Sequence, residues 1–154
     1  MDNDIKQRLY SISALFVLIN IVYFLILELS GATSNIEEMV RFGASRADLV
    51  FFNYEYFRLV SSMFMHFDIM HIAGNMIILF LLGERLEHVI GKVNFILIYL
   101  LSGIFSSVFS CIYDIYVNDM VVSAGASGAV FGIIGALIYI LAVSKRMVEG
   151  LELR

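Results

Sequence analysis

Four long apolar runs, separated by polar connections, dominate the pattern of this chain. The breaks between them are Glu28 to Asp48, the pair Gly91 and Lys92, and Asp114 to Asp119. A helix needs about 20 apolar residues to cross the ~30 Å hydrocarbon core of a bilayer. The pattern therefore predicts four transmembrane helices, at about residues 9–27, 69–88, 93–113 and 126–143.

A further apolar stretch, Leu49 to Phe67, does not fit this template. It is rich in Phe and Tyr, but Glu55 and Arg58 interrupt it. It is too broken for a membrane span and too apolar for a solvated loop. We expect an interfacial or re-entrant segment. The sequence leaves open whether this segment is a helical hairpin or irregular.

Composition supports a membrane protein and excludes some functions. Hydrophobic residues make up 60% of the 154 residues and charged residues 16%, against roughly 45–50% and about 25% in soluble domains. The net charge is −4 without a basic run, so nucleic acid is not an expected partner. The expected fold class is an all-α membrane protein, a polytopic helix bundle with one membrane domain over residues 1–154. We expect such a protein to have the lipid bilayer as one of its partners.

The distribution of Lys and Arg predicts the orientation, because cytoplasmic segments carry an excess of both. With the N-terminus inside, inside segments hold seven of the 10 Lys and Arg residues, and outside segments hold three. We therefore expect a multi-pass protein with a cytoplasmic N-terminus. In this arrangement residues 71, 75 and 127 lie at a similar depth in the outer half of the membrane.

Ser127 opens the fourth run within the string Gly125-Ala126-Ser127-Gly128. A serine in the first turn of a helix lies near unpaired backbone N–H groups and the positive end of the helix dipole. Both favour an oxyanion, whose stabilisation is often the largest catalytic contribution. The plainer interpretation is a packing serine beside a face of small residues at four-residue spacing, Gly128, Gly132 and Ala136. The two interpretations are compatible.

His71 and Asn75 are four residues apart in the second predicted span and share a helix face. Polar side chains at membrane depth are costly unless protein or a wet cavity surrounds them. One interpretation makes them two side-chain donors for an oxyanion, and the other makes them an interhelical hydrogen-bonded pair. The presence of Ser127 favours the first.

We expect three further polar residues to have structural roles. His66 lies five residues before His71, hence on another face, and we expect it to bond the backbone of the interfacial or re-entrant segment. Arg58 either extends to the interface or holds carbonyl groups of that segment. Glu87 is expected to cap or bond local backbone. We also expect the small-residue face of the fourth span to need neighbours from outside this chain.

Other intramembrane chemistries lack their motifs. A zinc protease needs His-Glu-x-x-His, whereas His66 and His71 have the wrong spacing and no Glu. An aspartyl site needs two carboxylates in the membrane, but Asp114 is at a span end and no Gly-x-Gly-Asp occurs. The third and fourth runs lack the charges typical of transporters. No metal or cofactor is implied.

These residues together resemble the rhomboid intramembrane serine proteases in their bacterial form. The resemblance implies that Ser127 is the nucleophile, that His71, Asn75 and the Ser127 backbone N–H form the oxyanion hole, and that Gly125 shapes the nucleophile turn. Arg58 and Glu87 are then structural, and the aromatic segment before His66 is the embedded first loop. The resemblance extends from about Phe57 to Gly135 and rests on Phe57-Arg58, Met65-His66-Phe67-Asp68-Ile69-Met70-His71-Ile72-Ala73-Gly74-Asn75, Glu87 with Gly91, and Gly125-Ala126-Ser127-Gly128-Ala129-Val130-Phe131-Gly132.

The resemblance also implies six core spans and a general base His on the sixth. This chain has four predicted spans, and none of its histidines, His66, His71 and His88, matches that base. A serine without a base is a poor nucleophile. We therefore expect a fragment of a longer protein, inactive alone, with the base His beyond Arg154. Phe57 stands where many members have Trp.

The implied function is intramembrane serine endopeptidase activity on transmembrane protein substrates, near the outer face of a bacterial inner membrane. The alternative is a base-less, non-catalytic rhomboid-like protein that binds client transmembrane helices through the same groove. The sequence leaves open the identity of the substrate and the oligomeric state.

Overall fold

The computed structural model describes residues 11–152, with side chains through residue 145. In this part of the chain the regular structure is helical apart from an isolated bridge between Ser45 and Ser123. The predicted all-α class is confirmed. The helices in chain order are α2 (Ile12–Leu29), η1 (Ala32–Ser34), α3 (Ile36–Arg41), α4 (Ala47–Phe51), α5 (Arg58–Ser61), η2 (Ser62–Phe64), α6 (Ile69–Ile90), α7 (Lys92–Val117) and α8 (Ser127–Glu152).

Four of these helices, α2, α6, α7 and α8, are long and apolar enough to cross a membrane. α7 continues through Asp114 and ends at Val117, and its C-cap Asn118 adopts the left-handed conformation with φ of 56°. α8 begins at Ser127 and continues beyond Val143, the expected end of the fourth span. The expected first span begins at residue 9, and residues 9 and 10 lie outside the described part of the chain.

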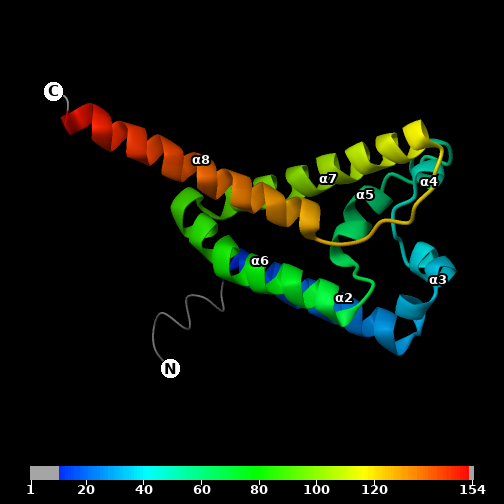
Figure 1. Cartoon of the computed structure of the whole chain (residues 1–154). Helices are drawn as coiled ribbons and strands as arrows, with labels where there is room; N and C mark the ends of the chain where they lie inside the picture. The colour runs from blue at the N-terminus through cyan, green and yellow to red at the C-terminus, as the bar shows by residue number, and fades with distance from the viewer. Residues whose placement is uncertain (1–10, 153–154) are drawn as a thin grey trace.

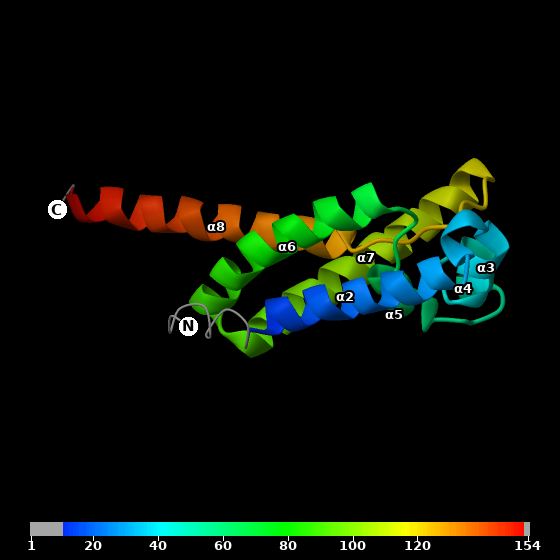
Figure 2. The same cartoon turned by 90° about the horizontal axis from the view of Figure 1, so that it is seen from below.

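The long helices pack in pairs along the molecule. α2 contacts α6, α7 contacts α8, and α6 also contacts α8 (Figure 1). Their shared core includes the fully buried Leu79, Phe95, Tyr99 and Ile133. The short helices gather at one end of the bundle, whereas the start of α2 and the far end of α8 lie at the other (Figures 1 and 2). This arrangement is the one that an even number of spans produces.

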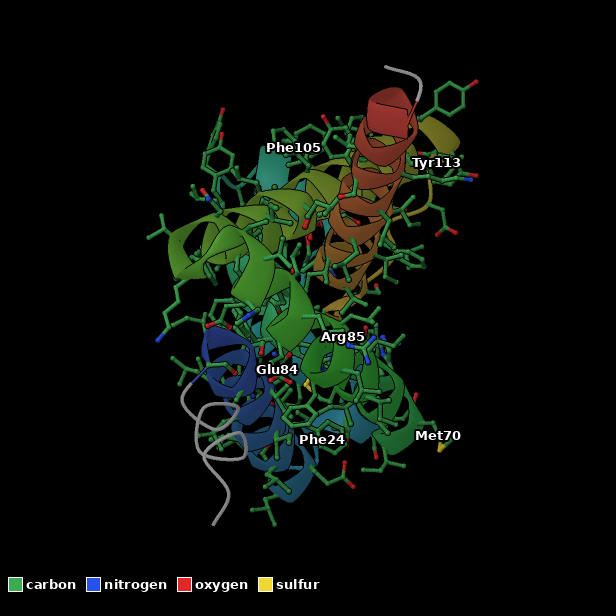
Figure 3. The ribbon with its side chains drawn as sticks, turned by 90° about the vertical axis from the view of Figure 1, so that its left-hand side faces the viewer. Phe24, Met70, Glu84, Arg85, Phe105 and Tyr113 are labelled. Carbon is green, nitrogen blue, oxygen red and sulfur yellow. The ribbon has the colours of Figure 1, made fainter. Side chains whose placement is uncertain are left out.

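The outer surface of the long helices is apolar. Exposed side chains include Leu18 and Leu25 on α2 and Phe131 and Tyr139 on α8. Met70, at the start of α6, points away from the bundle (Figure 3). Such a surface is unfavourable in water but matches lipid tails, which are equally apolar. The chain is therefore an integral, multi-pass membrane protein.

The first connection, residues 30–68, folds into short helices and not into one hairpin. Buried Arg58 holds it together: Nη1 donates to the carbonyl oxygens of Val40 and Ala44 at 2.6 and 3.0 Å, and Nε donates to Glu55 at 2.7 Å. The carbonyls lie before residue 49, so Arg58 joins the aromatic stretch to the preceding turn. The aromatic rings that this fold exposes are typical of a membrane interface: Phe52, Tyr54, Tyr56 and Phe57.

Glu87, near the C-terminal end of α6, fixes the start of α2. Its carboxylate oxygens accept the backbone N–H groups of Ile12 and Ser13 at 3.0 and 2.9 Å. N–H groups in the first turn of a helix have no partner within the helix, and the dipole favours a negative charge there. Glu87 thus caps a helix and bonds backbone, as expected, but the helix is α2 and the backbone is not local in sequence.

Candidate active site

The segment that connects α7 to α8, residues 118–126, is bonded to the first connection at three residues. Ser45 and Ser123 exchange two backbone hydrogen bonds, of 2.9 and 2.8 Å. The Gly125 N–H donates to the Ser62 carbonyl at 2.9 Å, and the Ala126 N–H donates to His66 Nε2 at 3.4 Å. The start of α8 is therefore held by the first connection as well as by α7.

Ser127 is the first residue of α8, and α8 begins partway along α7 (Figure 1). A Cβ on the neighbouring Gly128 would meet the side chain of Ser106. At ~1.5 Å per residue, Ser106 lies roughly 16 Å along the helix axis from the end of α7 at Val117. The exposed Ser127 side chain thus lies below the end of the bundle, at a helix start that favours negative charge.

Gly125 brings Ser127 and His71 to one place. Its φ of +138° is a conformation that residues with a side chain rarely adopt. A Cβ at this position would lie 2.8 Å from both Nε2 and Cε1 of His71, and 3.9 Å from Ser127 Oγ. The imidazole and the hydroxyl therefore face one point, which a glycine leaves open.

Asn75 follows His71 by one turn of α6. It is 8% exposed, and its Nδ2 donates to the His71 carbonyl at 2.9 Å. Since a side-chain amide has two N–H donors, one is left for a ligand. The His71 ring stacks on Phe67. The backbone N–H of His71 donates to Oδ1 of Asp68, which caps α6. The start of α6 therefore presents two polar side chains from a fixed turn.

A cavity of about 280 Å³ lies beside Ser127, between α7, the connecting segment and the first connection. Ser127 is predicted from the sequence as a candidate site residue, but the other serines that line this cavity are not. The sequence does hold a signal for a row of hydroxyls on one helix face, because Ser102, Ser106 and Ser110 recur at four-residue spacing on α7. The serines that line the cavity are Ser62, Ser106, Ser107, Ser110, Ser123 and Ser127.

His66 is fully buried, and its ring meets that of His71 edge-on with centroids 4.9 Å apart. It accepts the N–H of Ala126, so the backbone that it bonds is the connecting segment and not, as expected, the embedded one. Burial, with a smaller contribution from His71, lowers the pKa of His66 to about 4, while Asp68 acts in the opposite direction. The imidazole is therefore neutral at pH 7.

Gly128 and Gly132 form the contact between α8 and α7. A Cβ at either position would overlap a serine of α7, Ser106 or Ser102. Small residues permit this close approach of two backbones. The expectation that this face needs neighbours from outside the chain is therefore wrong, since α7 covers it. Among the side chains described, no group of three His, Cys, Asp or Glu residues is arranged to hold a metal ion.

Comparison with known proteins gives consistent matches. The Rhomboid domain family matches residues 53–154. The Rhomboid protease GluP of Bacillus subtilis (strain 168) is 38% identical over 133 residues, which are 86% of this chain and 25% of that protein. RHOMBOID-like protein 1 of Arabidopsis thaliana is 35% identical over 98 residues, which are 64% of this chain and 24% of that protein.

A second Bacillus subtilis protein, the putative rhomboid protease YdcA, is 31% identical over 98 residues, which are 62% of this chain and 47% of that protein. The chain thus spans about a quarter of the length of the first two relatives and about half of the third. The family match covers more than half of the chain and includes both His71 and Ser127. This chain belongs to the rhomboid family.

Proposed function

We propose that this chain is part of an intramembrane serine endopeptidase that cuts transmembrane protein substrates near the outer face of the bilayer, with Ser127 as nucleophile. The observation that carries the proposal is the approach of the His71 ring and Ser127 Oγ to one point beside Gly125. Membership of a family that includes proteases supports the reaction class. The depth at which α8 begins supports cleavage within the membrane (Figure 1).

The reaction begins when Ser127 Oγ attacks the scissile carbonyl carbon, whose oxygen becomes an oxyanion. His71 through a ring N–H, Asn75 through its second amide N–H, and the backbone N–H of Ser127 donate to that oxygen. The start of α8 adds its dipole. These donors are held before the reaction begins, so little reorganisation accompanies the developing charge.

We assign the general base to a histidine outside this chain, as the rhomboid resemblance implies. We assign the 3 histidines of this chain to positions other than that of the general base. His66 accepts the Ala126 N–H, His71 lies on the oxyanion side, and His88 is exposed near the inner end of α6. The external histidine takes the proton of the Ser127 hydroxyl and returns it to the leaving amine. The 154 residues alone should therefore not cleave.

The same placement of the histidines favours one alternative, a non-catalytic rhomboid-like protein that binds client transmembrane helices.

For either function we propose a cytoplasmic N-terminus and a bacterial inner membrane, supported by the excess of Lys and Arg in the segments assigned to the inside. Labelling of Asn53→Cys from outside sealed cells and of His88→Cys only after permeabilisation is the expected result. The reverse pattern would contradict this orientation.

The test of function is a cleavage assay with purified full-length protein and a single-span substrate tagged at both ends. We expect the wild type to release a fragment whose new terminus maps near the outer end of the substrate span. Ser127→Ala should abolish cleavage, whereas Ser144→Ala, exposed on the inner half of the same helix, should not change it. Cleavage by Ser127→Ala refutes the proposal, and substrate binding without cleavage by the wild type favours the alternative.

A further inference from the structure

His66 is the most deeply buried polar side chain beside the site. It is 0% exposed, and its Nε2 accepts the backbone N–H of Ala126, the residue before Ser127. We infer that His66 is a positioning residue of the Ser127 site, which acts only as the neutral imidazole and releases the start of α8 when it takes up a proton. The inference rests on the proposed function, because it concerns how Ser127 is held for that reaction.

Two consecutive N–H groups before Ser127 are engaged by the first connection. The Gly125 N–H donates to the Ser62 carbonyl, and the Ala126 N–H donates to His66. The Ala126 carbonyl in turn accepts the Val130 N–H at 2.9 Å, so the peptide group between Ala126 and Ser127 is fixed as well and the direction of the Ser127 N–H is set. That N–H is one of the proposed oxyanion donors. His66 therefore orients the nucleophile and one donor without touching the substrate.

The bond from Ala126 fixes the protonation state that His66 needs. Nε2 must offer a lone pair, so the neutral ring carries its proton on Nδ1. Nδ1 is buried and has no hydrogen-bond partner among the described residues. A second proton, on Nε2, would make both ring nitrogens donors. The new Nε2–H would then point at the Ala126 N–H, and two donors cannot bond. The protonated ring thus loses its one hydrogen bond and repels the amide that it held.

Two titratable groups act on His66, and both lie at the start of α6. They are His71, with ring centroids 4.9 Å apart, and Asp68, which caps the helix. The flanking residues 62–65 and 123–126 carry no titratable side chain. Burial outweighs the attraction of Asp68 and holds the pKa of His66 at about 4. The site should therefore be released in acid and intact at neutral pH.

The test uses the cleavage assay with the full-length protein. His66→Gln keeps an acceptor oxygen near the position of Nε2 but does not titrate, whereas His66→Leu has no acceptor. At pH 7 we expect His66→Gln to retain most of the wild-type kcat. His66→Leu should lose about tenfold or more in kcat with KM little changed, because a buried N–H is left without a partner. His88→Leu, at the far end of α6, is the control and should keep the wild-type kcat.

The pH profile separates positioning from a merely structural role. The ratio of the His66→Gln rate to the wild-type rate cancels the titration of every group that the two proteins share. We expect this ratio to be constant from neutral pH down to about 6 and to rise about twofold by pH 4, where half of His66 is protonated. A ratio that stays flat to pH 4 overturns the inference.

Hydrogen exchange at the Ala126 amide gives a readout that needs no activity. We expect wild type and His66→Gln to protect this amide equally at pH 7, with wild-type protection falling relative to His66→Gln toward pH 4. Equal protection at both pH values overturns the inference, and this comparison stands even if His66→Leu does not fold. Failure of the proposed function gives a different result. Ser127→Ala would then still cleave, while the exchange protection of the Ala126 amide would still depend on the protonation of His66.

Discussion

Gly125 occupies a position with no room for a side chain. Because an added Cβ would lie 2.8 Å from the His71 ring at a φ of +138°, Gly125→Ala must displace His71 and strain the turn. We expect kcat of the full-length protein to fall by about tenfold or more in the cleavage assay. Gly31→Ala is the matched control, since its φ is +76° but nothing lies within 4 Å. Equal losses in both would show that strain alone, and not displacement of His71, is responsible.

The helix positions of the candidate site residues could be predicted from sequence, but the partners of the buried polar side chains could not. His71, Asn75 and Ser127 are recognisable because spacing along a helix and position at a helix start are local features. The partner of His66 lies 60 residues later in the chain, and one partner of Glu87 lies 75 residues earlier. Which backbone N–H a buried polar side chain reaches depends on the tertiary path of the chain, which periodicity does not contain.

At the scale of elements, the contact between α7 and α8 sets the depth of Ser127. A Cβ at Gly132 would overlap Ser102, whereas a Cβ at Gly135, one turn further on, would meet nothing within 4 Å. We expect Gly132→Ala to destabilise the full-length protein in detergent by about 1–3 kcal/mol. Gly135→Ala should be neutral or stabilise it by up to about 1 kcal/mol. Denaturant titration of the two variants measures the difference.

A second substitution makes this comparison sharper. Ser102→Gly removes the side chain that an alanine at 132 would meet, so it should restore stability to Gly132→Ala. Two sites in contact are expected to be non-additive in this way. Additive losses in the double variant, or equal effects at 132 and 135, would contradict the close approach of α7 and α8.

The existence of the long helices followed from the apolar runs, because a bilayer demands about 20 apolar residues per span. Their ends were less predictable. α7 continues through Asp114, since a carboxylate near the end of a span does not by itself stop a helix. The serines of α7 were overlooked because hydroxyls are tolerated in membrane helices: Ser102 donates to the Ile98 carbonyl of its own helix at 2.5 Å.

At the scale of the whole molecule, four separated parts of the chain converge on the start of α8. They are the turn at Ser45, the residues from Ser62 to His66, the start of α6 with His71 and Asn75, and the middle of α7. Long-range assembly of this kind explains why the first connection is folded and bonded although it spans no membrane. We propose that this assembly holds Ser127 as a nucleophile.

The most direct test of this claim is to identify the residue of the full-length protein that reacts with a fluorophosphonate probe, by mass spectrometry of its peptides. An activated serine reacts with such a probe, and a packing serine does not. We expect an adduct on Ser127, lost in Ser127→Ala and retained in Ser110→Ala, a variant of another cavity serine. An adduct on a different serine, or labelling of Ser127→Ala at the wild-type rate, would show that Ser127 is not the nucleophile.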